Sequence, residues 1–125
     1  MGAALTTADA LEGMLNKPLY VALRLPLDLS RIAELLPAHL EWAVRAEQRG
    51  ELFASGPFAA PGAAPGTAGG MTILRAVSED EARSILAVDP FVREGVFTVD
   101  VRRWILMEGS VTLNVRFSDQ SVRVL

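Results

Sequence analysis

Apolar residues recur along this chain at two spacings, one typical of strands and one typical of helices. Short, mostly apolar runs bounded by glycine, proline or polar residues predict four β-strands, at 19–25, 51–58, 71–77 and 97–106. From Ile32 to Val44 apolar residues recur every three or four positions, which predicts an amphipathic helix. A second helix is predicted to begin at the Ser-x-x-Glu capping box of Ser78 and Glu81 and to end near Val88. The core elements therefore follow one another as strand, helix, strand, strand, helix, strand.

Proline and glycine mark the boundaries of several of these elements. Pro37 interrupts the first helical pattern, so either a lead-in helix ends just before it or one helix is kinked there. Gly50 is typical of a helix end. Because proline cannot donate a hydrogen bond to a neighbouring strand, we expect pairing of the second strand to weaken or end at Gly56 and Pro57. Residues 59–70 follow as a long loop of mainly alanine, glycine and proline, and such loops tend to be functional or disordered.

Both ends of the chain extend beyond this core. Residues 1–18 form an expected N-terminal extension in which Thr6 or Thr7 caps a short helix. The turn residues 108–110 predict a hairpin that leads from the fourth strand into a further strand at 111–117, and the last residues add a short strand. We expect this tail to extend the sheet or to clasp a partner subunit.

The element order predicts an α+β fold. Two interleaved strand–helix–strand units form the ferredoxin-like βαββαβ layout, in which two helices cover one face of an antiparallel sheet. A chain of 125 residues, half of them apolar, is long enough to bury one such core. We therefore expect residues 19–125 to form one domain, with 105–125 as an appended C-terminal extension that contains a β-hairpin. The other face of so apolar a sheet needs cover, which predicts a homodimer with the two sheets packed face to face.

Charge and composition weigh against several classes of function. The formal net charge is −3, with eleven arginines and the single lysine Lys17, so we expect no nucleic-acid partner. The chain has no cysteine, no secretory signal pattern and no apolar stretch of the ~20 residues that a membrane helix needs. These features predict a soluble, cytoplasmic protein with no membrane partner.

His39 and Asp89 are the residues most suited to acid–base chemistry. His39 is the only histidine and lies at the edge of the apolar stripe of the first helix, as either a structural residue or a general base or acid. Asp89 precedes Pro90, where it either ends the second helix or accepts a hydrogen bond from the His39 ring. From the residues alone, the structural interpretation is favoured for both.

Other common kinds of site find little support. Ser55 lacks the Gly-x-Ser-x-Gly context of a hydrolase nucleophile, although its hydroxyl and the amides around Gly56 are able to hold a ligand. With one histidine, no cysteine and the carboxylates of 79–81 in a helix cap, we expect no metal site. The glycines of 59–70 do not match a phosphate-binding loop, which needs a following helix with Lys and Ser or Thr. We expect no cofactor.

Several short motifs occur in an order that resembles one known family. They are His39-Leu40-Glu41-Trp42, the run GELFASGPF at 50–58, the Ser-x-x-Glu-Ala helix start, Asp89-Pro90-Phe91-Val92 with Gly95 after it, and the strand with Trp104. Over about residues 19–104 the chain resembles a YciI-like, or YCII-related, domain. Each motif is weak alone, whereas their order and spacing are fairly specific.

The resemblance implies the fold of the dimeric α/β barrels and a catalytic pair formed by His39 and Asp89. Residues of the second strand and of the Asp-Pro-Phe turn are implied to bind substrate in the same cleft: Ser55, Gly56, Pro57, Phe58 and Phe91. The family includes dehydrochlorinases of chlorinated hydroquinols, and related barrels include lactone isomerases and monooxygenases. Family members often carry an arginine a few residues before the histidine, and the nearest candidate here is Arg31.

Two functions follow as hypotheses. The first is a cofactor-independent enzyme, a lyase such as a dehydrochlorinase or an isomerase, that acts on a small aromatic or enolisable molecule, as in the degradation of aromatic compounds. His39 moves a proton, Asp89 orients the ring, and Ser55 helps to hold an oxygen. The second is a non-catalytic dimeric module that binds a small ligand or another protein, since folds of this kind host many functions. Coupling between His39 and Asp89 distinguishes the enzyme from the module.

Overall fold

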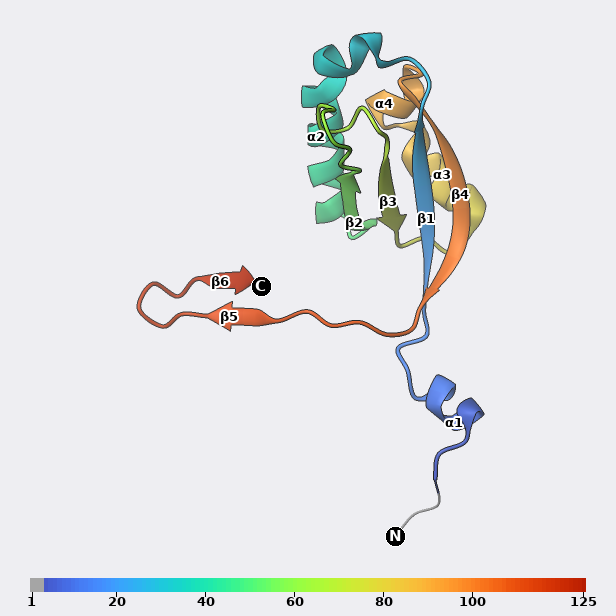
Figure 1. The fold of residues 1–125 in the computed structure, drawn as a ribbon, viewed down its shortest axis with the longest axis vertical. Helices are drawn as coiled ribbons and strands as arrows, with labels where there is room; N and C mark the ends of the chain where they lie inside the picture. The colour runs from blue at the N-terminus through green and yellow to red at the C-terminus, as the bar shows by residue number, and fades with distance from the viewer. Residues whose placement is uncertain (1–3) are drawn as a thin grey trace. The chain divides into compact units, whose positions relative to one another are not determined.

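The fold is taken from a computed structural model, which describes residues 4–125. The described chain divides into two compact units (Figure 1). The larger unit spans 18–105, and the smaller unit combines the described residues up to Lys17 with 106–125. The larger unit carries every element of the predicted core.

The larger unit is an α+β fold with a four-stranded sheet. Its strands are β1 (Lys17–Pro26), β2 (Leu52–Pro57), β3 (Gly70–Leu74) and β4 (Phe97–Leu106). Their order in the sheet is β2-β3-β1-β4, and β3 pairs antiparallel with both β1 and β2. Its α-helices are α2 (Ile32–Gln48), α3 (Glu79–Ala87) and the short α4 (Pro90–Arg93). This order is that of the ferredoxin-like layout, so the predicted α+β fold class is confirmed.

Helix α2 begins and ends on local signals. Asp28 accepts a hydrogen bond from the Ser30 N–H and so caps a 3-10 turn, Leu29–Arg31, that leads into α2. The helix then runs through Pro37 as a single element, so no separate lead-in α-helix ends before the proline. Gly50, with a φ of 78°, follows its C-terminus in the left-handed conformation that glycine adopts most easily.

Two side-chain caps place the segment that carries the site. Ser78 accepts a hydrogen bond from the Glu81 N–H at the start of α3, as the capping box predicts. Asp89 does more than end α3, because its side chain accepts from the Phe91 N–H and opens α4 at Pro90. Helix α4 was not predicted from the sequence, because its four residues are too few to show a helical period.

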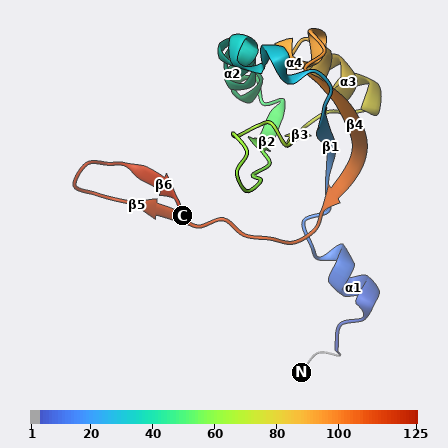
Figure 2. The same ribbon diagram turned by 45° about the horizontal axis from the view of Figure 1, so that its top comes forward.

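The two faces of the sheet have different surroundings. Figure 2 shows α2, α3 and α4 gathered on one side of the four strands. Alternation along the strands turns one set of side chains toward these helices, where they form the main core. This core contains Ala22, Leu52, Leu74 and Val101 from the sheet, Trp42 and Ala46 from α2, and Ala82, Ile85 and Leu86 from α3.

The opposite face of the sheet carries apolar side chains that no helix of the larger unit covers. Val21, Met71, Ile73 and Trp104 line a shallow hollow of about 310 Å³ there, together with Arg102 and Arg103. Met71 and Trp104 are 36% and 39% exposed, values typical of a surface and not of a core. Within the larger unit, the sheet therefore has the helix-free apolar face that the strand pattern predicted.

The largest difference between predicted and observed strand bounds in the larger unit is at the end of β3. β3 ends at Leu74, whereas 71–77 was expected to be a strand. Its ladder to β1 stops at the pair Tyr20 and Leu74, and the chain then leaves the sheet to reach the Ser78 cap. Pairing of β2 with β3 ends at Pro57, as expected.

The smaller unit contains α1 (Thr7–Glu12), capped by Thr6, and a hairpin of β5 (Leu113–Val115) and β6 (Val122–Val124). The predicted hairpin turn at 108–110 is wrong, because β5 pairs with β6 in a separate two-stranded sheet. Its register matches Leu113 with Val124 and Val115 with Val122, so apolar side chains meet across the strands, an arrangement that stabilises a hairpin. No helix within 4–125 has the length and apolar content to cross a membrane.

Candidate active site

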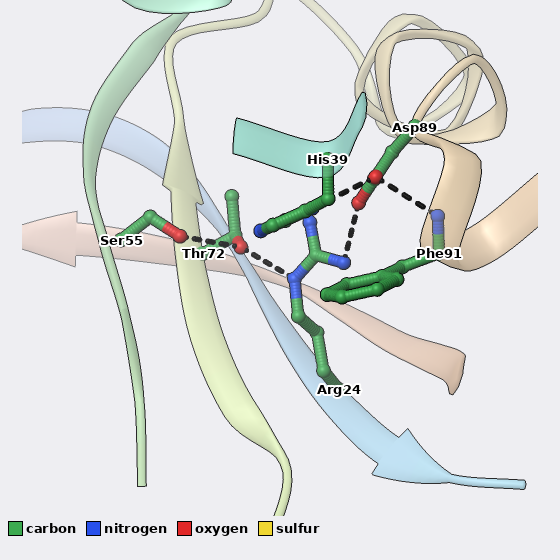
Figure 3. A network of polar contacts seen from close by, with 6 residues as sticks. All are labelled: Arg24, His39, Ser55, Thr72, Asp89 and Phe91. Carbon is green, nitrogen blue, oxygen red and sulfur yellow. Dashed lines mark hydrogen bonds and ion pairs between the residues drawn. The ribbon is translucent and has the colours of Figure 1, made fainter. Parts of the chain in front are cut away.

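The site is built around a contact between α2 and the turn that precedes α4. His39 Nδ1 lies 2.9 Å from Asp89 Oδ1 (Figure 3). The ring of Phe91 stacks on the His39 ring, with centroids 4.3 Å apart and an angle of 15° between the planes. A carboxylate on one nitrogen and an aromatic ring on one face hold the imidazole in a single orientation.

Asp89 is a fully buried carboxylate whose partners are all donors. Oδ1 receives the His39 contact and a hydrogen bond of 3.1 Å from the Phe91 N–H, while Oδ2 accepts from Arg24 Nη1 at 2.6 Å. Its side chain has no exposed surface, so these partners replace water completely.

The surroundings of Asp89 favour its charged form. Burial raises the pKa of Asp89, but the hydrogen bond from His39 and the charge of Arg24 together lower it by more. The pKa of Asp89 therefore lies below the ordinary value of a carboxyl group. Asp89 is ionised at neutral pH and accepts the proton that His39 Nδ1 carries.

Arg24 brings a buried cation to the same place. It lies on β1 at 6% exposure, two residues beyond the core residue Ala22 and on the same face of the sheet. Its guanidinium donates to Asp89 through Nη1 and to Thr72 Oγ1 through Nε at 2.8 Å, and it lies over the Trp42 ring at 5.6 Å. Its remaining nitrogen, Nη2, is buried and has no hydrogen-bond partner within 4–125.

A cavity of about 450 Å³ opens beside these residues. Polar side chains reach it from three elements: Arg24 from β1, His39 and Glu47 from α2, and Ser55 from β2. The rest of its lining is apolar or glycine and includes Ala43, Val44, Leu52, Phe53, Ala54, Gly56, Pro57, Phe91 and Phe97. A pocket of this size and character fits one small, largely apolar molecule with a few polar groups.

The end of the 59–70 loop closes one side of the cavity, with Gly66, Gly69 and Gly70 in the lining. Gly69 has a φ of 85°, and a Cβ on it would lie 2.3 Å from the Arg24 carbonyl oxygen. Only glycine permits so close an approach of the loop to β1. The loop is thereby held against the strand that carries Arg24.

Comparison with known proteins identifies the family of the chain. The family model described as the YCII-related domain matches residues 19–105. The chain belongs to this family. The resemblance seen over about 19–104 is thus confirmed. No curated protein matches the chain significantly.

One solved structure resembles this YCII-related chain, and the match covers most of the solved protein. It is the 5-chloro-2-hydroxyhydroquinone dehydrochlorinase (TftG) of Burkholderia phenoliruptrix AC1100, in complex with 2,5-dihydroxybenzoquinone. The two share 25% sequence identity with a TM-score of 0.56, and the match covers 69% of this chain and 92% of that one. Family and neighbour together support a small-molecule enzyme of the YCII-related family.

The structure brings most of the sequence-predicted site residues of this YCII-related protein to one place. His39, Ser55, Gly56, Pro57 and Phe91 line the cavity, and Asp89 lies directly behind the His39 ring. Phe58 is not in that lining. It contributes to a separate hollow with Met71 and Ile73 on the other side of β2 and β3.

Arg24 is the site residue that sequence reasoning missed. Arg31 was the nearest arginine before His39, but it is 44% exposed, pairs with Glu34 and Glu94, and does not line the cavity. The signal for Arg24 was present, since it is the one charged residue in the apolar strand 19–25. A charge at a buried strand position needs a partner, so this arginine marks a polar site.

Metal ligation finds no support in the part of the chain that the structure describes. No group of three or more His, Asp or Glu side chains lies close enough together there to hold an ion.

Proposed function

We propose that this protein is a cofactor-independent lyase or isomerase that transfers a proton on a small aromatic or enolisable molecule. The main support for this proposal is the environment of the His39 ring. One ring nitrogen is in contact with Asp89, and the ring lines a cavity that is otherwise largely apolar. Figure 3 shows the second ring nitrogen turned away from Asp89, on the side of Ser55 and Thr72.

The tautomer of His39 depends on its partner. An ionised Asp89 only accepts hydrogen bonds, so Nδ1 of His39 carries the proton of this contact. In the neutral ring Nε2 is then unprotonated and free to act as a base. When Nε2 takes a proton from a substrate carbon, the imidazolium that forms is stabilised by the buried carboxylate.

The oxygen of the substrate meets positive charge in the same cavity. Removal of a proton beside a carbonyl or on a phenolic ring places negative charge on an oxygen atom. Arg24 and Ser55 both line the cavity, so the positive charge of Arg24 and the hydroxyl of Ser55 are suited to stabilise that oxygen.

Elimination and isomerisation share this proton transfer and differ in the step after it. In an elimination the electron pair of the broken C–H bond forms a new double bond as a leaving group departs from the neighbouring position. In an isomerisation the proton returns from His39 to another carbon. The dehydrochlorinase activity in the name of the solved neighbour supports the first, and its bound quinone supports an aromatic or quinonoid ligand.

We also propose that two copies of this chain pair through the uncovered sheet face. Val21, Met71 and Trp104 present apolar side chains there beside the buried Ile73, and exposed apolar surface of this kind is typical of a subunit interface. Face-to-face packing of two such sheets gives the dimeric α/β barrel. The terminal segments 1–18 and 105–125 then act as extensions of the family domain.

The test is an assay of purified wild type with 5-chloro-2-hydroxyhydroquinone and with enolisable ring compounds, following chloride release and proton exchange with deuterium oxide. His39→Ala is expected to lower turnover by at least about a hundredfold, the usual contribution of a general base. Leu40→Ala, at the exposed next position of α2, is the control and should keep its activity. A folded His39→Ala variant with wild-type turnover would exclude the proposal, as would a wild type inactive on both classes.

A further inference from the structure

Thr72 joins two sides of the cavity from the middle of the sheet. It lies on β3, where its register partners are Ala22 on β1 and Ser55 on β2. Its side chain has no exposed surface. Figure 3 shows it between Arg24 and Ser55.

The donors and acceptors around Thr72 give its contact with Ser55 a direction. Thr72 Oγ1 accepts from Arg24 Nε at 2.8 Å, and an arginine has no acceptor to offer in return. The one other polar contact of Oγ1 within 4–125 is Ser55 Oγ, at 2.9 Å. A buried hydroxyl whose proton has no acceptor is strongly disfavoured, so Thr72 donates its proton to Ser55.

The direction of this bond decides what Ser55 offers to a ligand. Since Ser55 Oγ accepts from Thr72, the Ser55 proton is free to point into the cavity that Ser55 lines. The charge of Arg24 strengthens the effect, because hydrogen bonds in a chain polarise one another in the same sense. Ser55 therefore acts as a donor in the cavity that Arg24 also lines.

We infer that Thr72 is a positioning residue that makes Ser55 a hydrogen-bond donor and selects ligands with an acceptor oxygen at this end of the cavity. The ligand class is an enolate, phenolate or carboxylate oxygen, as opposed to a hydroxyl that must donate. This inference rests on the proposed function for the identity of the ligand. The direction of the hydrogen bond from Thr72 to Ser55 in the free protein does not depend on the proposed function.

The first experiment determines, without any ligand, which of the two hydroxyl groups donates. NMR of protein with 13C-labelled threonine and serine detects hydroxyl protons that exchange slowly with water. The expected result is a protected hydroxyl proton on Thr72 that is absent from Thr72→Val and retained on the serine of Thr72→Ser. A protected proton on Ser55 in its place, or an unprotected Thr72 hydroxyl, overturns the inference.

The second experiment measures binding of 2,5-dihydroxybenzoquinone by absorbance titration. Thr72→Val, which keeps the shape but removes the hydroxyl, is expected to weaken binding about tenfold, as is Ser55→Ala. The double variant should bind no more weakly than Ser55→Ala, because both changes remove the same donor. Thr72→Ser, which restores a hydroxyl, should remain within about twofold of wild type.

Other results distinguish a failure of the role assigned to Thr72 from a failure of the proposed function. Wild-type affinity in Thr72→Val, or a further tenfold loss in the double variant, shows that Thr72 does not act through Ser55 and overturns the inference. If wild type does not bind the quinone, the proposed function fails for this ligand class, and the protected hydroxyl alone decides the role of Thr72. Circular dichroism of each variant establishes that it is folded, and Thr72→Ala, which also removes the hydroxyl, replaces Thr72→Val should the valine variant unfold.

Discussion

Arg24 donates a hydrogen bond of 2.6 Å to Asp89 from a position 65 residues earlier in the chain, and both side chains are buried. The second oxygen of the same carboxylate receives the His39 ring. One buried aspartate thus holds both the base that is proposed to move a proton and the cation that is proposed to stabilise the product. The stability of the fold and the chemistry of the site are coupled through this group.

Loss of Arg24 is expected to destabilise the protein strongly. Arg24→Met leaves Asp89 buried without its cation, and removal of one partner of a buried ion pair costs about 3–5 kcal/mol. Urea unfolding measures this loss in the free energy of unfolding. Arg31→Met is the matched control, because the exposed ion pairs of Arg31 are expected to contribute little to the free energy of unfolding. Equal losses in the two variants would contradict the role assigned to Arg24.

The stability of the protein is expected to fall in acid through Asp89. The pKa of Asp89 is lower in the folded state than in the unfolded chain, so the unfolded state binds its proton more readily. The stability from this site is complete above the unfolded-state pKa of ~3.9 and is lost as the pH falls through the lower folded-state pKa. Urea midpoints from about pH 6 down to about pH 3 should therefore decline more in wild type than in Asp89→Asn. The same decline in both proteins would show that another group governs acid stability.

The tautomer of His39 is expected to reverse in Asp89→Asn. An amide is able to donate to Nδ1, which moves the ring proton to Nε2 and removes the free base from the cavity. Two-bond 1H–15N spectra distinguish the tautomers and should show Nδ1–H in wild type and Nε2–H in the variant. The variant should also lose turnover by about a hundredfold or more while keeping its fold. An Nε2–H ring in the wild type would refute the proposed base.

The uncovered sheet face is expected to hold two copies together. Met71→Glu places a charge in the apolar hollow of that face and should convert a dimer to a monomer, because an unpaired charge is costly in an apolar interface. Sedimentation equilibrium measures the change. Leu40→Glu, at an exposed apolar position on α2, introduces the same charge on the other side and should leave the dimer intact. A monomeric wild type at micromolar concentration would contradict the proposed dimer.

Much of the fold was predictable because its signals are local. Ser78 and Gly50 mark helix ends through contacts within a few residues, and the apolar alternation of a strand is visible in its own sequence. The α4 helix and the β5–β6 pairing were not predictable in this way. The four residues of α4 are too few to show a helical period. The choice of pairing partner for β5 depends on register with another strand, which its own sequence does not specify.

The α+β class, the family and the candidates His39, Asp89 and Ser55 could be predicted from the amino-acid sequence alone, since they depend on periods and motifs written along the chain. That Arg24 and Thr72 join these candidates became visible only in the folded protein. Both lie inside apolar strands, where the charge of Arg24 indicates a buried polar partner but does not identify it, and Thr72 gives no signal beyond a buried position. Their partners come from other strands and from a turn far along the chain, and hydrogen bonds depend on distance and direction in space.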